Sequence, residues 1–269
     1  ALPADWVHPT ARHDRVRRRL VASLESPWLD YLPKRGLYLP RTARRIRQCD
    51  VTFGVLHAWK DGAKFMVLPM TCNSVACPHC ARLRSIDRAR RSARIPGLAD
   101  ANLRCITLTI QNPHPGQLVN SMDRMGKAFH QFRRHQSGEA WARHVRGYLW
   151  AIEVTYNRKA DTWHPHIHIL YDGTYWPQAA LNDAWQSRCR RQDLKGFADI
   201  RQAHNRGRRI ESTQDKMAAV MEVSKYVVKP LSEGFLDPNR IAELLDALHR
   251  RQTHGSAGSL AVPLKPKSD

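Results

Sequence analysis

The sequence predicts an α+β fold in which helices flank an antiparallel sheet and a small zinc-binding module is attached. Segments with the alternation of β-strands are interleaved with segments of helical periodicity. None of them is joined by the glycine-rich loop that marks parallel βαβ units, which favours antiparallel pairing. Four of the six cysteines fall between residues 49 and 80, which predicts the module.

Composition divides the 269-residue chain into four consecutive segments. Residues 1–48 are rich in arginine and punctuated by proline, so we expect a basic arm with one short helix and irregular stretches. Residues 49–98 contain the cysteine module and a basic helix, and residues 99–252 contain the predicted sheet. Residues 253–269, "THGSAGSLAVPLKPKSD", have low complexity and are expected to be disordered.

The first predicted elements have clear local signals. A hairpin over residues 50–70 would return the chain to the later cysteines, and the basic helix over 81–95 ends at a Pro-Gly pair. Residues 104–110 alternate between apolar and polar side chains, as in a half-buried strand. Residues 117–135 carry an apolar stripe at helical spacing.

The later elements follow the same logic. The stretches 147–156 and 163–171 alternate on either side of the polar "NRKAD" and predict a β-hairpin. A threonine start signal and a proline stop bound a helix over 213–230. Further helices are expected over 177–191 and 238–252.

The charge balance predicts a polyanionic partner. The chain has 44 Lys and Arg residues against 24 Asp and Glu residues, a formal net charge of +20. Such an excess attracts nucleic acid by neutralising phosphates and releasing counterions; a solubilising basic surface is the alternative. No run of 18 or more apolar residues is present, so no membrane span is expected. The N-terminal stretch lacks the apolar core of a secretion signal, so no export is expected.

The segment "TWHPHIHIL" (162–170) carries three histidines at every second position. On a strand, His164, His166 and His168 share one face. On the preceding strand Glu153 falls opposite either His166 or the next residue, and the first register is favoured because the second buries a carboxylate beside an isoleucine. Two imidazoles and a carboxylate with open positions suit a catalytic Mg²⁺ or Mn²⁺ ion. We prefer Glu153 as the third ligand; His164 is the alternative.

The segment "MEVSKYVVKP" (221–230) places polar side chains on one arc of its helix. Glu222, Tyr226 and Lys229 lie within about 60° of one another around the axis. The apolar residues fall on a separate arc, so the tyrosine points away from the predicted core. A surface ion pair between Glu222 and a lysine is the commoner meaning of such a pattern.

The cysteine cluster favours a structural Zn²⁺ ion with four protein ligands. His57 or His79 could replace the first of its cysteines. A redox dithiol is the alternative, because "CPHC" is similar to the active site of thiol oxidoreductases; the further cysteine five residues upstream and the lack of an export signal favour zinc. The expected zinc ligands are Cys49, Cys72, Cys77 and Cys80.

The helix that follows the cysteines carries a dense set of arginines. It is expected either to bind duplex DNA or to form a solvated cationic face. The candidate DNA-binding residues are Arg82, Arg84, Arg88 and Arg91.

Taken together, these segments resemble the rolling-circle replication initiators of the HUH endonuclease superfamily, in particular the one-tyrosine plasmid Rep proteins. The resemblance lies in "ITLTIQN" (106–112), "EVTYN" with "WHPHIHIL" (153–170) and "EVSKYVVKP" (222–230), in this order, after the cysteines. It spans about residues 49–230. It implies that residues 99–252 form an HUH nicking domain with a ferredoxin-like or RRM-like core.

The resemblance also implies a role for each matched residue. Tyr226 would attack a phosphodiester of single-stranded or extruded origin DNA, leaving a 5′-phosphotyrosine link and a free 3′-OH. A metal on His166 and His168 would polarise the scissile phosphate, and Lys229 would orient it. Glu222 would activate water at termination. The implied partners are origin DNA, a host helicase and a polymerase, in the bacterial cytoplasm.

Two other classes of protein share some of these features. Insertion-sequence transposases of the same superfamily usually carry two catalytic tyrosines, and Glu222 occupies one of those places here. A non-catalytic zinc protein that binds nucleic acid would account for the charge and the cysteines, but not for Glu153, the histidines and Tyr226. A position of Tyr171 or Tyr175 at the metal would weaken the one-tyrosine interpretation.

Overall fold

The computed structural model describes residues 11–49, 52–59, 62–69, 71–92, 94–134, 138–202, 204–205, 208–209, 212–224 and 237–263. The chain divides into two compact units, one combining residues 1–84 with 231–246 and the other combining residues 85–230 with 247–269. Each unit therefore draws on two separate stretches of chain, which differs from the four consecutive segments expected from the sequence.

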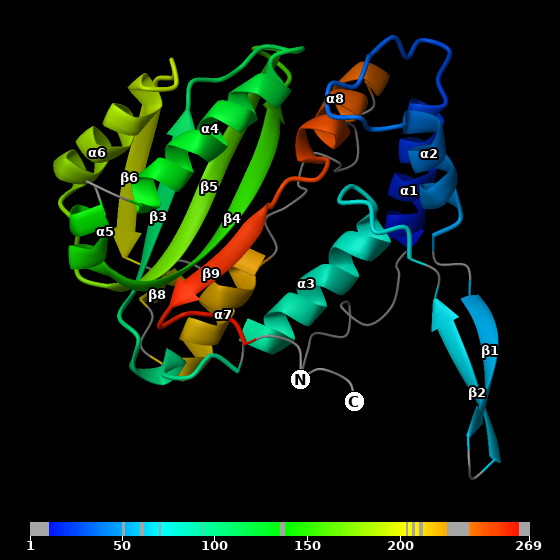
Figure 1. The fold of residues 1–269 in the computed structure, drawn as a ribbon, viewed down its shortest axis with the longest axis horizontal. Helices are drawn as coiled ribbons and strands as arrows, with labels where there is room; N and C mark the ends of the chain where they lie inside the picture. Colours follow the sequence, from blue (N-terminus) through cyan, green and yellow to red (C-terminus); the bar gives the residue numbers. More distant parts are fainter. Residues whose placement is uncertain are drawn as a thin grey trace. The chain divides into compact units, whose positions relative to one another are not determined.

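Figure 1 labels the helices and strands. The helices are α1 (Ala11–Leu24), α2 (Leu39–Arg47), α3 (Pro78–Ser92), α4 (Leu118–Arg133), α5 (Gly138–His144), α6 (Gln178–Arg190), α7 (Thr213–Ser224) and α8 (Pro238–Leu248), with a short 3-10 helix at Leu98–Asp100. The strands are β1 (Thr52–Trp59), β2 (Gly62–Pro69), β3 (Leu103–Ile110), β4 (Val145–Asn157), β5 (Thr162–Gly173), β6 (Gly196–Gln202), β7 (His204–Asn205), β8 (Arg208–Arg209) and β9 (His254–Gly258). No described helix combines the length and apolar character needed to cross a bilayer.

Five strands of the larger unit pair antiparallel in the order β6-β3-β5-β4-β9 (Figure 1). This sheet and its flanking helices confirm the predicted α+β class. The hairpins β1–β2 and β4–β5 are both present where they were expected. In the β4–β5 turn, the Asn157 side-chain oxygen accepts hydrogen bonds of 3.0 and 3.2 Å from the backbone N–H groups of Lys159 and Ala160. This turn helps to fix the register of the two strands. Edge strand β6 was not predicted.

One face of the sheet is apolar and is covered by α4 and α6 (Figure 1). Ile106, Leu108 and Ile110 of β3 alternate as predicted and are at most 2% exposed. Phe129 of α4 packs edge-on against Trp150 of β4, with ring centroids 5.2 Å apart. One part of the core of the larger unit therefore lies between these helices and the sheet.

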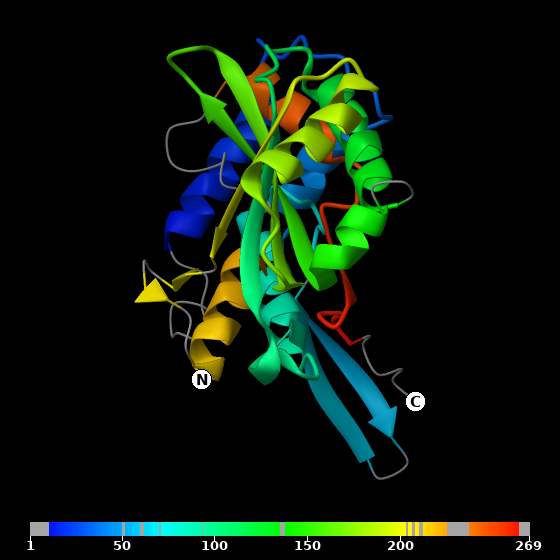
Figure 2. The same cartoon turned by 90° about the vertical axis from the view of Figure 1, so that its left-hand side faces the viewer.

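Helix α7 lies on the opposite face of the sheet from α4, as the gold and green helices of Figure 2 show. Its Val220 and Val223 side chains belong to a buried cluster with Leu149 and Ala151 of β4. Because strand residues alternate between faces, these β4 residues share the face of Glu153. Helix α7 therefore packs on the sheet face that carries the histidines.

Strand β9 lies within the tail that was expected to be disordered. It pairs with β4, and Leu260 just beyond it is fully buried, so that expectation is wrong for this part of the chain. Its small residues are needed for close packing. A Cβ atom on Gly255 would lie 2.6 Å from Nε1 of Trp150, closer than real Cβ contacts come, so Trp150 or the strand would have to shift.

The smaller unit has more helix in its first residues than the sequence suggested. Helices α1 and α2 contact each other, and Leu20, Leu24, Ala43 and Ile46 are at most 3% exposed. The expectation of a basic arm with one short helix and irregular stretches is therefore wrong for the described part of this segment. It contains two helices, whose apolar residues at helical spacing give it a core of its own.

Asp246 of α8 anchors the segment between α1 and α2. Its buried carboxylate accepts hydrogen bonds from the backbone N–H groups of Lys34 and Arg35, at 2.6 and 3.0 Å, and from the Tyr31 hydroxyl at 3.0 Å. Burial and the nearby carboxylate raise the pKa of Tyr31. These contacts explain why residues far apart in sequence belong to one unit.

Candidate active site

The register of the β4–β5 hairpin brings Glu153 to the histidine face. Glu153 lies directly opposite His166, while Ala151 lies opposite His168 and Thr155 opposite His164. Residues opposite each other in an antiparallel pair point to the same side. The register favoured from the sequence is therefore confirmed.

The side chains of Glu153, His166 and His168 converge. Oε2 of Glu153 lies 2.7 Å from Nε2 of His168 and 3.6 Å from Nε2 of His166. Glu153 is 3% exposed and His166 is 9% exposed. One ligand atom from each residue lies within 4.8 Å of the others, so the group could hold a metal ion. A buried carboxylate with two imidazoles is a donor set that suits a divalent cation.

His164, the alternative third ligand, has a different partner. Its Nδ1 atom lies 2.6 Å from Oδ1 of Asn112, and it is not part of the converging group. Burial lowers the pKa of His164, although the nearby charge of Glu153 acts in the opposite direction. The geometry therefore joins Glu153, rather than His164, to the other two imidazoles.

Two polar residues that contact the histidines were not predicted from the sequence as part of the site. Oγ1 of Thr107 lies 3.5 Å from Nδ1 of His168, and Asn112 contacts His164. Both residues lie in the motif "ITLTIQN". The threonines of β3 alternate onto the histidine face, and that alternation was the available signal.

Helix α7 carries Glu222, an exposed residue on the helix that packs on the histidine face. The helix is described up to Ser224. Tyr226 and Lys229 lie outside the described residues, so their predicted roles stay predictions.

The two other tyrosines near the histidine run do not join the metal-ligand group. Tyr171 belongs to the opposite face of β5 and is fully buried. Its hydroxyl donates a hydrogen bond of 2.9 Å to the Thr174 carbonyl, and burial raises its pKa to about 12. Tyr175 lies beyond the end of β5 and is 53% exposed.

The four predicted zinc ligands come together in the smaller unit. The sulfur of Cys49 lies 3.5 Å from that of Cys80 and 3.6 Å from that of Cys77, and the sulfurs of Cys72 and Cys80 are 3.5 Å apart. A tetrahedral zinc ion with Zn–S bonds of about 2.3 Å spaces its sulfurs by about 3.8 Å, so the cluster fits zinc closely. All four residues are buried.

The start of α3 contributes to the chemistry of this cluster. Hydrogen bonds from the thiols of Cys72 and Cys77 lower the pKa of Cys80, which lies in the first turn of the helix. The positive end of a helix dipole also favours a thiolate. Metal ligation requires thiolates, and this environment favours one at Cys80, whereas hydrogen bonds within the cluster and burial raise the pKa of Cys72 and Cys77.

The arginines predicted to bind DNA have varied surroundings on α3. Arg84 donates hydrogen bonds of 3.0 and 2.7 Å to backbone carbonyls of the loop between the second and third cysteines. Arg88 is 9% exposed, and Arg91 pairs with an aspartate one turn earlier at 3.1 Å. Arg82 is partly exposed. Arg84 thus stabilises the cysteine module, and DNA contact by these residues stays a prediction.

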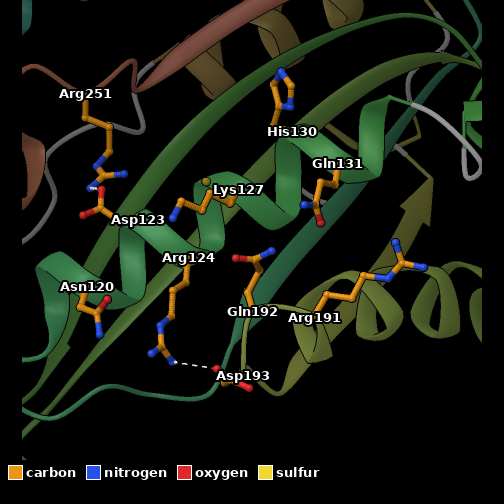
Figure 3. A pocket seen from close by; sticks show the side chains of 11 residues that line it. Asn120, Asp123, Arg124, Lys127, His130, Gln131, Arg191, Gln192, Asp193 and Arg251 are labelled. Atoms are coloured by element: carbon orange, nitrogen blue, oxygen red, sulfur yellow. Dashed lines mark hydrogen bonds and ion pairs between the residues drawn. The ribbon is translucent and has the colours of Figure 1, made fainter.

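A groove of about 740 Å³ runs along the outer side of α4. Figure 3 shows its lining from α4, from the end of α6 and from Arg251, which pairs with Asp123 at 2.7 Å. Arg124 faces Asp193 across it at 4.0 Å. Because α4 covers the apolar face of the sheet, this groove is separate from the Glu153 group.

The chain is similar to known replication proteins. Residues 63–267, more than half of the chain, match the model of a family described as replication protein. The chain is 24% identical to the protein rep of Streptococcus pneumoniae serotype 2, over 82% of this chain and 70% of the relative. It is 27% identical to the protein rep of Bacillus amyloliquefaciens, over 89% and 77%, and 27% identical to that of a Bacillus species, over 83% and 80%. No solved structure matches the chain.

Proposed function

This chain belongs to the replication protein family of plasmid rolling-circle initiators, and on that premise we propose that it nicks and rejoins one strand of origin DNA through a covalent tyrosine link. The observation that carries the proposal is the convergence of Glu153, His166 and His168 on one face of the sheet. A protein that only bound DNA would have no use for this buried donor set.

The donor set fits Mg²⁺ or Mn²⁺ as the catalytic ion. Such an ion would polarise the scissile phosphate and stabilise the charge that builds up on it. Glu153 is buried and supplies the negative charge, while Thr107, near Nδ1 of His168, helps to orient that ring.

Tyr226 is the proposed nucleophile. Its hydroxyl oxygen bonds to the scissile phosphorus, and the bond from phosphorus to the 3′ oxygen breaks. The leaving oxygen takes up a proton and becomes the free 3′-OH from which a polymerase extends. The 5′ phosphate stays on Tyr226, which conserves the bond for later rejoining. The motif and the packing of α7 on the histidine face support this role.

Glu222 and Lys229 complete the proposed set. Lys229 orients the phosphate. Glu222 lies four residues before Tyr226 in the sequence and acts as a general base that activates water when the closing strand is cut. Its exposure on α7 gives water access to the carboxylate.

The four cysteines are proposed to hold a structural Zn²⁺ ion, because four protein ligands leave no open position for chemistry. The proposed partners are origin DNA at a single-stranded or hairpin nick site with its flanking duplex, a host helicase and a polymerase. The proposed setting is the bacterial cytoplasm.

The test is a search for the covalent intermediate. The protein is incubated with single-stranded origin oligonucleotides and Mn²⁺, then denatured. We expect an adduct that survives denaturation, that is lost with EDTA and that is absent from Tyr226→Phe. Nicking that persists in Tyr226→Phe would refute the assignment of the nucleophile.

A further inference from the structure

A row of four side chains runs across the sheet through the candidate metal group. Phe197 of β6 pairs with Thr109 of β3, Thr109 pairs with His166 of β5, and His166 pairs with Glu153 of β4. Opposite residues share a face, so all four point to the same side. Adjacent strands lie about 4.8 Å apart, which puts the Phe197 backbone roughly 10 Å from that of His166.

Phe197 is 57% exposed, yet it belongs to a firmly held strand. On its inner side β6 pairs with β3 along its whole length. On its outer side α6 replaces the missing neighbour strand. The Asn182 side chain accepts a hydrogen bond of 3.0 Å from the Ala198 N–H, and Gln178 accepts one of 2.9 Å from the Ile200 N–H. The ring is therefore presented to solvent from a fixed backbone.

The ring borders a groove of about 320 Å³ on the histidine face. This volume falls at the lower end of the range for small-ligand sites, about 300–1,000 Å³. Thr107 and Thr109 contribute hydroxyls to its lining. Arg201, whose side chain is 78% exposed, pairs with Asp199 at 2.6 Å along the same strand. An aromatic face, hydroxyls and a guanidinium are the groups that bind a base, a sugar and a phosphate.

We infer that Phe197 stacks on a base of the single-stranded DNA whose scissile phosphate lies at the Glu153, His166 and His168 group. This inference rests on the proposed function. The distance along the row from His166 to Phe197 is one that a DNA strand can span between its scissile phosphate and a neighbouring base. Stacking on an aromatic ring tolerates any base, so Phe197 holds the strand in place while other contacts select the sequence.

The experiment measures binding without catalysis. A fluorescein-labelled oligo-dT of about 12 nucleotides, within the usual site size for single strands, is titrated with protein in EDTA. An abasic sugar-phosphate chain of equal length carries the same charge without bases. We expect the wild type to prefer oligo-dT. Phe197→Ala should weaken oligo-dT binding roughly 5- to 150-fold and leave abasic binding unchanged.

Two further variants keep the result specific. Phe197→Trp should restore the preference for bases, and its fluorescence should be quenched by oligo-dT but not by the abasic chain. Tyr175→Ala, which removes an equally exposed ring outside the row, should bind as the wild type does.

Equal loss of oligo-dT and abasic binding in Phe197→Ala, or no loss at all, would overturn the inference. The covalent adduct in Mn²⁺ would still form in that case, so the proposed function would stand. If the wild type formed no covalent adduct but still preferred oligo-dT to the abasic chain, the result would instead count against the nicking mechanism.

Discussion

Nε2 of His168 lies 2.7 Å from Oε2 of Glu153, although the two residues are diagonal neighbours across β4 and β5 rather than a direct pair. The carboxylate thus leans towards the diagonal imidazole and lies 3.6 Å from the one directly opposite. The Glu153 carboxylate therefore lies close to two histidines of the same strand, His166 and His168.

Replacing Glu153 should impair metal binding directly. Glu153→Ala removes the only charged donor of the three, so its affinity for Mn²⁺ should fall at least about tenfold. His164→Ala should keep nearly the full affinity, because His164 contacts Asn112 instead of the group. Calorimetric titration of the DNA-free protein with Mn²⁺ measures both. A larger loss in His164→Ala than in Glu153→Ala would make His164 the third ligand.

Replacing Glu222 should separate cleavage from release. Glu222→Ala should still form the Tyr226 adduct but release DNA about 10²- to 10⁴-fold more slowly, the usual contribution of a general base. The adduct is followed over time on denaturing gels, with Glu222→Asp as the variant that keeps a carboxylate. Release at the wild-type rate in Glu222→Ala would remove this residue from the mechanism.

The cysteine cluster should contain one zinc ion per chain. Cys77→Ser takes away one of the four sulfurs, so metal content should drop and the smaller unit should become sensitive to protease. Cys189→Ala is the control, because this buried cysteine lies outside the cluster. Elemental analysis of the purified variants gives the result. Retained protease resistance in a zinc-free Cys77→Ser protein would contradict a structural role for the ion.

Asp172 should make stability depend on pH. Its buried carboxylate accepts hydrogen bonds from Arg146, from Ser259 at 2.8 Å and from the Asn102 N–H at 2.8 Å. Burial alone would raise its pKa, but these hydrogen bonds lower it overall. A lowered carboxyl pKa stabilises the fold above the ordinary value of about 3.9, and this contribution is lost as the pH falls below that value.

The matching variant is Asp172→Asn. It should lower the free energy of unfolding by roughly 1.5–3 kcal/mol at pH 7, the range for hydrogen bonds to a charged group. The difference from the wild type should shrink in acid, where the wild-type carboxyl is also neutral. Urea unfolding at several pH values measures it, and a difference that stayed constant into acid would show that the charge is unimportant.

Elements with strong local patterns were predictable from the sequence. The β4–β5 register followed from the cost of burying Glu153 among isoleucines, and the structure has that register. The cysteine spacing likewise anticipated the sulfur cluster. In both cases the interactions of a few side chains that are near one another in sequence are strong enough to determine the local structure.

The two edge strands could not be predicted, because their stability comes from distant residues. Strand β6, "GFADIRQ", contains residues that disfavour strands and depends on β3 and on the amides of Gln178 and Asn182. Strand β9, "HGSAG", has no apolar alternation; Gly255 fits against Trp150 of β4, and Gly258 fits against the backbone of Arg146 and Gly147. Because β6 was not predicted, the position of Phe197 in the same row as His166 could not be predicted either.

The position of β9 also limits when the larger unit can assemble during translation. Its partner β4 is made about a hundred residues earlier, and the intervening chain includes α8, whose first part belongs to the other unit. A nascent chain therefore has β4 as an open sheet edge until the ribosome has passed residue 258. Fusions or truncations that interrupt residues 254–260 should leave that edge uncovered and promote aggregation.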